Sequence, residues 1–243
     1  MKKLLMSKSI YVCLVFALVA SLSAGIMAQK TAGGEDLEDA RKDAGKATQV
    51  INEMARKPDD FIPRELLEKA EAIAVFPDVV KGAFIIGGSG GHGVISRKTT
   101  NGWGVPIFFN VGGASFGAQI GVKKTDYILL FMNDGAINDL SDEKLELGGD
   151  VSFAAGPVGR TAGASTTTSL DTGILTWSRS GGAFIGASLK GAELNADNSK
   201  NQAVYGMTAK EILANPVGVK TANLPSEIRG FSNAVAGYAA GRK

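Results

Sequence analysis

The stretch Val94-Ile-Ser-Arg-Lys-Thr-Thr-Asn-Gly-Trp-Gly-Val-Pro-Ile-Phe-Phe109 places two short apolar runs on either side of an Asn101-Gly102 pair. Asn-Gly between hydrophobic runs is the strongest short-range signal for a β-hairpin, because both turn positions take a positive φ. The stretch therefore predicts two antiparallel strands with Asn101-Gly102 at the hairpin tip.

Apolar runs of strand length continue on both sides of this hairpin. Residues 116–122 alternate between apolar and small or polar side chains, as a half-buried strand does. Residues 127–132 are apolar throughout, which is typical of a strand covered on both faces. Tight turns rather than helices separate the runs, so we expect an antiparallel sheet from Ala72 to Leu194. Six of its side chains are predicted to be buried: Phe116, Ile120, Ile128, Leu130, Phe153 and Ile185.

Helical spacing dominates before and after this region. Apolar or small residues recur every three or four positions from Leu37 to Met54, and Pro63 suits the first turn of a second helix. Thr208 and Glu211 have the spacing of a capping box. The last segment places four residues on one helical stripe: Ile228, Phe231, Val235 and Tyr238. The predicted fold class is α+β, with N- and C-terminal helices packed on the sheet.

Glycine makes this sheet unusual. Of the 32 glycines, 23 lie between Gly82 and Gly191. Small residues on strand faces let a sheet coil tightly, so a partly closed barrel is a second form that the glycine-rich sheet could take.

The first 28 residues predict a signal peptide. Three lysines and no acidic residue accompany an apolar run from Ile10 to Ala20, and small residues lead to Ala28. We expect export to the periplasm or the extracellular space, with residues 29–243 forming one domain. This part has 23 basic and 24 acidic residues, which excludes bulk charge as a basis for nucleic-acid binding. The single cysteine, Cys13, lies in the predicted leader, so no disulfide or thiol nucleophile is expected.

Motifs of catalytic type lack their usual context. Residues 88–93 match the spacing of a dinucleotide-binding turn, but a β-like run follows them where a helix is needed. Ser89 and Ser115 each lie in a G-x-S-x-G string, and neither string leads into a helix. His92, the only histidine, follows Ser89 too closely to be the base of that fold, and we interpret it as a turn or surface residue. The sequence predicts no enzyme.

Cofactor and metal sites are not expected either. A single histidine excludes zinc sites built on several histidines or cysteines. Asp134, Asp139, Asp142 and Glu143 approach the alternation of a calcium loop without meeting it, and we interpret them as a solvated loop.

A set of motifs in fixed order resembles the SYLF-domain lipid-binding family. They run from Ala70-Glu-Ala-Ile-Ala-Val-Phe-Pro77 through Gly112-Gly-Ala-Ser-Phe-Gly-Ala-Gln-Ile-Gly121 and Ala154-Ala-Gly-Pro-Val-Gly-Arg160 to Tyr205-Gly206. The resemblance covers about residues 36–215, with residues 216–243 as a helical extension. It implies a non-enzymatic module that binds lipid headgroups or a membrane surface. Eukaryotic members bind phosphoinositides or actin, and bacterial members are exported.

Two kinds of residue are candidates for lipid contact. Arg97, Lys98, Lys123 and Lys124 lie at predicted strand ends, where cations attract an anionic surface or simply keep turns solvated. The stripe of Ile228, Phe231, Val235 and Tyr238 would insert into a membrane if its helix undocked; a core-facing helix is the other interpretation. Residues 29–81 hold 9 basic and 12 acidic residues, unlike the basic N-terminal segment of lipid-binding relatives. A cell-envelope protein partner without a lipid ligand is the alternative function.

Overall fold

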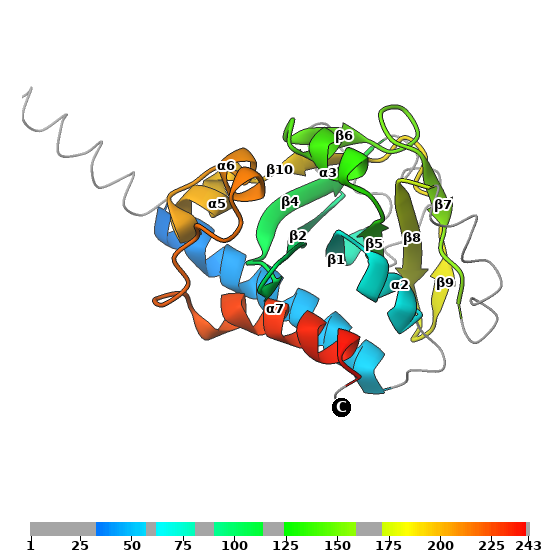
Figure 1. The fold of residues 1–243 in the computed structure, drawn as a ribbon, viewed down its shortest axis with the longest axis horizontal. Helices are drawn as coiled ribbons and strands as arrows, with labels where there is room; N and C mark the ends of the chain where they lie inside the picture. Colours follow the sequence, from blue (N-terminus) through cyan, green and yellow to red (C-terminus); the bar gives the residue numbers. More distant parts are fainter. Residues whose placement is uncertain (1–32, 57–61, 81–89, 114–123, 159–171, 242–243) are drawn as a thin grey trace, which may run out of the picture.

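The fold joins a curled sheet to helices from both ends of the chain (Figure 1). The computed structural model describes residues 33–56, 62–80, 90–113, 124–158 and 172–241. The predicted signal peptide and the residues Phe116, Ile120 and Lys123 lie outside the described residues.

The elements follow the order helices, strands, helices. The N-terminal helix (residues 33–56) precedes α2 (Arg64–Lys69), and the chain ends in three further helices. These are α5 (Asn198–Tyr205), α6 (Ala209–Ala214) and α7 (Ser226–Ala239). Between them lie α3 (Asp134–Leu140) and the strands β1 (Ala72–Val80), β2 (Gly91–Thr99), β3 (Gly102–Trp103), β4 (Ile107–Gly112), β5 (Lys124–Phe131), β6 (Lys144–Glu146), β7 (Phe153–Ala155), β8 (Ile174–Arg179), β9 (Phe184–Gly186) and β10 (Glu193–Ala196).

The described strands form one sheet in the order β6-β10-β4-β2-β1-β5-β8-β7, with β3 paired to β2 and β9 to β8. The central register pairs Val75 of β1 with Val94 on one side and Ile128 on the other. Pairing is antiparallel except between β7 and β8, which run parallel. The antiparallel prediction is therefore correct for the sheet as a whole and wrong at this one pair, where β7 reaches β8 through a long connection rather than a hairpin.

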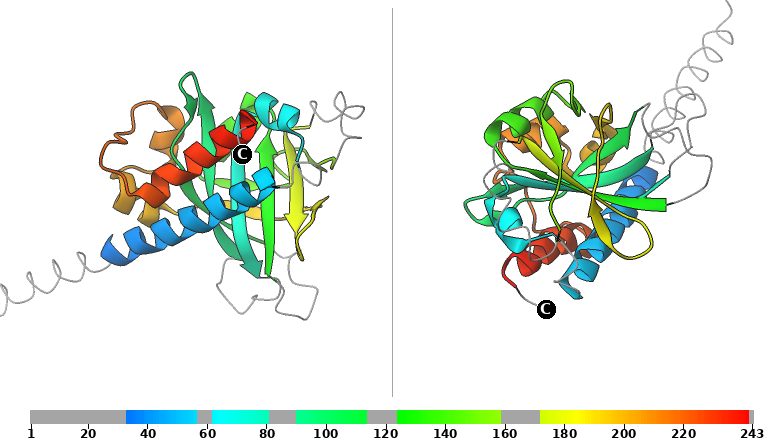
Figure 2. Two further views of the ribbon diagram at one scale, coloured as in Figure 1. Left: turned by 90° about the horizontal axis from the view of Figure 1, so that it is seen from below. Right: turned by 90° about the vertical axis from the view of Figure 1, so that its right-hand side faces the viewer.

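The sheet curls until its outer strands approach each other. β6 and β7 lie at opposite ends of the strand order, yet a turn joins them and Leu147 forms a parallel bridge with Val151. Glycine permits the tight curvature: a Cβ on Gly93 of β2 would overlap the Val75 carbonyl, and one on Gly156 would overlap the Trp177 ring. The end view in Figure 2 shows the curled sheet with helices below it. The predicted partly closed barrel is confirmed as a half-barrel.

The N-terminal helix and α7 lie side by side across one side of the sheet (Figures 1 and 2). The N-terminal helix buries small residues and three larger ones: Ala40, Ala44, Ala47, Val50, Ile51 and Met54. A Cβ on Gly230 of α7 would lie 3.8 Å from the Thr48 Oγ1, so the two helices approach closely. The prediction of helices from both chain ends packed on the sheet is confirmed.

Several local predictions are confirmed and others need correction. Ile128 and Leu130 are fully buried, and Thr208 with Glu211 forms the predicted capping box. Phe153 is only partly buried and Ile185 is 61% exposed, because β9 presents Phe184 to the core in its place. Of the residues interpreted as a solvated loop, Asp134 and Asp139 lie in α3, whose first turn is capped by the Asn133 side chain, and Asp142 and Glu143 lie in the turn after it. The hairpin tip is one residue earlier than predicted: Thr100 and Asn101 form the turn, and Gly102, with φ 114°, begins β3.

Candidate functional site

The N-terminal helix is bound to the rest of the fold by ion pairs on four different elements. Arg41 pairs with Glu227 of α7 at 2.6 Å, and Lys46 pairs with Asp78 of β1 at 3.0 Å. The same helix supplies Asp43 to Lys200 of α5 and Glu53 to Arg179 of β8. Its buried face is rich in alanine, which contributes little apolar area per residue. Ion pairs therefore add contacts to α7, β1, α5 and β8 beside this apolar packing.

Lys200 is the most enclosed of these charges. Its ammonium lies 2.9 Å from Asp43 and 3.1 Å from Asp197, and its side chain is only 9% exposed. Burial would lower the pKa of Lys200, but the hydrogen bonds and charges of the two carboxylates outweigh it and raise the pKa. The lysine is therefore held in its charged form.

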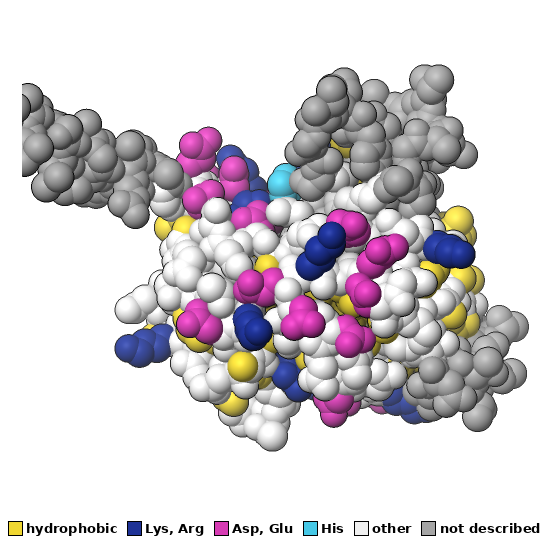
Figure 3. Space-filling view, turned by 90° about the horizontal axis from the view of Figure 1, so that it is seen from above, with side chains coloured by type: hydrophobic (Ala, Val, Ile, Leu, Met, Phe, Trp, Pro, Cys, Tyr) yellow, Lys and Arg dark blue, Asp and Glu magenta, His cyan; other side chains and the backbone are white. Residues whose placement is uncertain are grey.

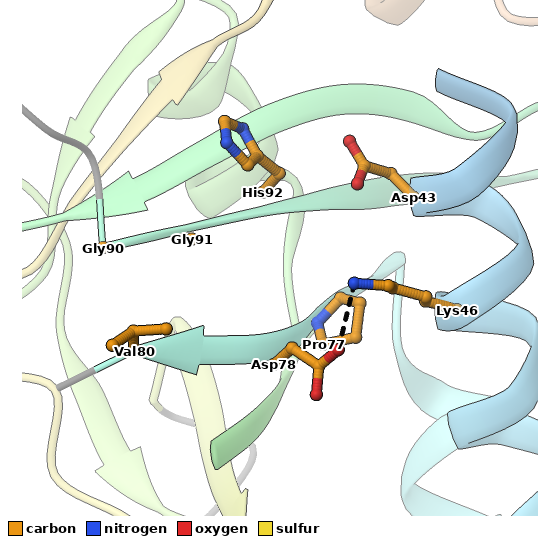
Figure 4. Close-up of a pocket in the computed structure, with 8 residues that line it drawn as sticks. All are labelled: Asp43, Lys46, Pro77, Asp78, Val80, Gly90, Gly91 and His92. Carbon is orange, nitrogen blue, oxygen red and sulfur yellow. Dashed lines mark ion pairs between the residues drawn. The ribbon is translucent and has the colours of Figure 1, made fainter. Parts of the chain in front are cut away.

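A small pocket of about 210 Å³ opens beside these contacts, between the N-terminal helix and the ends of β1 and β2 (Figure 4). Figure 4 shows Lys46 reaching across to Asp78, with His92 on the strand above. Asp78 has φ 53° and lies in a β-bulge after Pro77, which cannot donate to the strand ladder. Lys46 and then Lys124 lower the pKa of Asp78. The charges of this pocket serve to hold the helix on the sheet.

In the described residues, the His92 Nδ1 lies 3.4 Å from the Lys200 Nζ, whose ammonium already pairs with Asp43 and Asp197. The His92 ring is exposed, and the same Nδ1 lies 2.6 Å from the Asn110 Oδ1. Ser89 and Ser115 lie outside the described residues, so their geometry is not tested. Groups of three or more metal-ligating side chains are absent from the part of the chain that the structure describes.

A larger groove lies between the β2–β3 hairpin, the loop after α6 and α7. Its volume is about 510 Å³, within the usual range for ligand pockets. Gly104 lies at its narrow part: a Cβ placed there would be 3.8 Å from the Pro216 Cβ. Ser232 of α7 donates a hydrogen bond of 2.5 Å to the Gly104 carbonyl and so fixes one wall to the other. The lining residues are Thr99, Asn101, Trp103, Gly104, Val105, Pro106, Pro216, Val217, Val219, Thr221, Ile228, Arg229, Ser232 and Asn233.

Among the described residues that line the groove, Arg229 is the one charged residue and none is a carboxylate. Among the described residues, no ion pair or hydrogen bond involves the Arg229 side chain. Trp103 is partly exposed and Val217 is 58% exposed. The arrangement combines an uncompensated guanidinium with apolar walls and neutral hydrogen-bonding side chains.

The predicted apolar contact stripe lies in the core. Ile228, Phe231 and Val235 are 0% exposed and Tyr238 is 1% exposed. The Tyr238 hydroxyl donates to the Ile62 carbonyl, and burial raises the pKa of this phenol to about 12. Contact between this stripe and a membrane would require α7 to leave the sheet.

The predicted cations have separate partners, and Lys124 lies far from Arg97 and Lys98 along the sheet. Arg97 donates to the Leu213 carbonyl at 2.8 Å and lies 3.6 Å from Asp134, while Lys98 donates to the Glu68 carbonyl. Lys124 is 3.7 Å from Asp78 at the other end of the sheet. The structure does not gather these three residues into one basic patch.

Sequence reasoning missed Trp103, Val217 and Arg229. In the sequence, Trp103 directly follows the predicted hairpin tip, and an aromatic residue at that place is a signal for a surface contact. The role of Val217 depends on a loop packing beside a hairpin more than 100 residues earlier, for which the sequence has no local signal.

The face seen in Figure 3 has acidic and basic side chains interspersed. It therefore offers no surface of one sign to a charged partner. In the described residues, helices long and apolar enough to cross a bilayer are absent.

Comparisons with known proteins identify relatives along most of the chain. The Ysc84 family, described as "Las17-binding protein actin regulator", matches residues 112–237, just over half of the chain. Protein YSC84 of Saccharomyces cerevisiae is 31% identical over 196 residues, covering 76% of this chain and 42% of the yeast protein. SH3 domain-containing YSC84-like protein 1 of Homo sapiens is 28% identical over 172 residues, covering 68% of this chain and 50% of the human protein. The matches thus span half or less of these relatives' length.

Proposed function

Because this chain belongs to the Ysc84 family, the SYLF-domain family that its motifs indicate, we propose that it is a non-enzymatic module that binds a membrane surface. The proposal includes export, on the strength of residues 1–28. Intact-mass analysis of the exported protein should find an N-terminus at or near Gln29. A mature protein that still carries Cys13 would contradict this part.

The observation that carries the proposal is the exposed loop at the mouth of the groove. Val217 is the most exposed large hydrophobic side chain of this region, at 58%, and Lys220 follows it on the same loop. Arg229 lies on the adjacent groove wall. The nearby acidic residues have other partners, since Glu211 caps α6 and Glu227 pairs with Arg41. Two free cations therefore accompany one exposed apolar side chain.

The magnitude expected for such a contact is small. Each cation near an anionic surface contributes about 1 kcal/mol, and burial of part of a valine side chain about 1 kcal/mol more. The sum of roughly 3 kcal/mol corresponds to weak binding in the millimolar range. Contact through this loop leaves α7 docked on the sheet.

Flotation with lipid vesicles tests the proposal. We expect the protein to bind vesicles that contain phosphatidylglycerol more strongly than vesicles of phosphatidylcholine alone, and high salt to weaken the preference. Lys220→Gln should reduce binding, whereas Lys190→Gln, which removes one exposed cation elsewhere, should not. Equal binding to both vesicle types, or equal effects of the two variants, would contradict the proposal.

A protein-binding role is the second candidate, because the family's own description names a protein ligand, Las17. On this alternative the same exposed loop would contact an envelope protein, without a lipid ligand. Absence of flotation under every lipid and salt condition would favour it.

A further inference from the structure

We infer that the groove between Trp103 and α7 is a binding site for a single amphiphile with an anionic phosphate head. This inference rests on the proposed membrane function and names the ligand that the groove selects. The surface contact described above needs only the loop. The groove adds a hollow in which one molecule is enclosed.

Charge complementarity identifies the head of this ligand. Arg229 is the only charged residue among the groove's lining residues, and it has no ion-pair partner in the described residues. A guanidinium binds phosphate oxygens with two parallel hydrogen bonds. Asn101, Thr221 and Asn233 line the same groove and supply neutral donors for the remaining oxygens, whereas the Thr99 hydroxyl already donates to the Gly102 carbonyl. Because none of the described lining residues is a carboxylate, an anion meets no repulsion from these walls.

The walls identify the tail. Val217 is exposed, Trp103 is partly exposed, and the partly exposed Pro216 adds apolar surface without a backbone donor. Val105, Val219 and Ile228 are buried beneath them. An apolar chain can therefore lie along Trp103 while its head meets Arg229. Inorganic phosphate would gain only the second of these contacts.

The two tryptophans of the chain provide a specific probe. Trp177 is fully buried, and its indole nitrogen donates to the Pro157 carbonyl at 3.0 Å. Trp103 lines the groove. The experiment uses the full chain with a short-chain phosphatidylglycerol whose acyl chains carry bromine, below its critical micelle concentration. Binding in the groove should quench the fluorescence of Trp103 saturably and leave that of Trp177 unchanged.

Matched variants identify the contacts. Trp103→Phe should remove the quenching while calorimetry still detects binding. Arg229→Gln should weaken binding about tenfold, as loss of a charged hydrogen-bond donor does. Lys210→Gln removes one exposed cation of α6 outside the groove and should leave the affinity unchanged. Inorganic phosphate at millimolar concentration should not compete, and a phosphatidylcholine of the same chain length should bind more weakly.

Absence of saturable quenching would overturn the inference, and so would equal effects of Arg229→Gln and Lys210→Gln. Competition by inorganic phosphate at the affinity of the lipid would also overturn it, since the groove would then be a site for a free anion. Vesicle flotation without monomer binding would refute the groove site and leave the proposed function standing. Absence of both vesicle flotation and binding of the monomeric lipid would refute the proposed function as well.

Discussion

Replacement of Lys200 by methionine tests how the N-terminal helix is held. The substitution keeps most of the side-chain volume and removes the ammonium that lies between Asp43 and Asp197. Both carboxylates are largely enclosed, with side chains 15% and 13% exposed. Removal of one partner from a buried ion pair leaves an uncompensated charge, which costs about 3 to 5 kcal/mol.

We expect the cost of Lys200→Met to lie near 3 kcal/mol, because residual exposure of the two carboxylates lets water relieve part of the penalty. Urea denaturation at pH 7, followed by circular dichroism, measures the change in the free energy of unfolding. The double variant Lys200→Met/Asp43→Asn should recover part of the loss, since it removes one of the two unpaired charges. Lys210→Met removes an exposed cation of the next helix and should change stability by less than about 0.5 kcal/mol. A cost below about 1 kcal/mol for Lys200→Met, or no recovery in the double variant, would refute this account of the helix contact.

Three further predictions concern α7 and the curled sheet. Phe231→Ala should lower the free energy of unfolding by about 3 to 5 kcal/mol because its ring is fully buried, as urea denaturation would show; a near-neutral effect would mean that α7 is not part of the core. The Arg41 hydrogen bond lowers the pKa of Glu227 to about 2 from 4.5, so this contact stabilises the fold above about pH 4.5 and is lost as the pH falls toward 2. Arg41→Gln should move the pKa of Glu227 upward in an NMR titration, and an unchanged value would contradict the pairing. Gly93→Ala should destabilise the sheet strongly, because its Cβ would overlap the Val75 carbonyl, whereas Gly45→Ala in the N-terminal helix meets nothing within 4 Å and should be tolerated in the same thermal melts.

The order of elements could be predicted from the sequence because each depends on a local period. The spacing of Leu37 to Met54 predicts a helix, and the uninterrupted apolar run of residues 127–132 predicts the buried central strand β5. The parallel pairing of β7 with β8 and the bridge between Leu147 and Val151 depend on long-range closure of the sheet. No local period encodes that closure.

The candidate site was less predictable for a related reason. The stripe on α7 has the same sequence pattern whether it faces a core or a membrane, and only the docked helix shows that Ile228 and Phe231 are buried. From the sequence alone, Arg97 and Lys98 are expected to be exposed to solvent. In the structure they donate hydrogen bonds to the backbone carbonyls of Leu213 in α6 and Glu68 in α2. The groove itself arises where Trp103 meets a loop and a helix from the other end of the chain.

A reversible crosslink between the N-terminal helix and α7 tests the central claim, that the membrane contact uses the docked fold. Thr48 and Gly230 face each other, since a Cβ on Gly230 would lie 3.8 Å from the Thr48 Oγ1 and 3.9 Å from the Thr48 Cγ2, so cysteines at these two positions can be joined by a short reducible crosslinker. The measurement is vesicle flotation of the crosslinked Thr48→Cys/Gly230→Cys protein, with Cys13→Ser, before and after reduction. Equal binding of the crosslinked and reduced forms to phosphatidylglycerol vesicles is the result that the account predicts. Binding that is lost on crosslinking and restored by reduction would show that α7 must leave the sheet to reach the membrane, and would contradict the account.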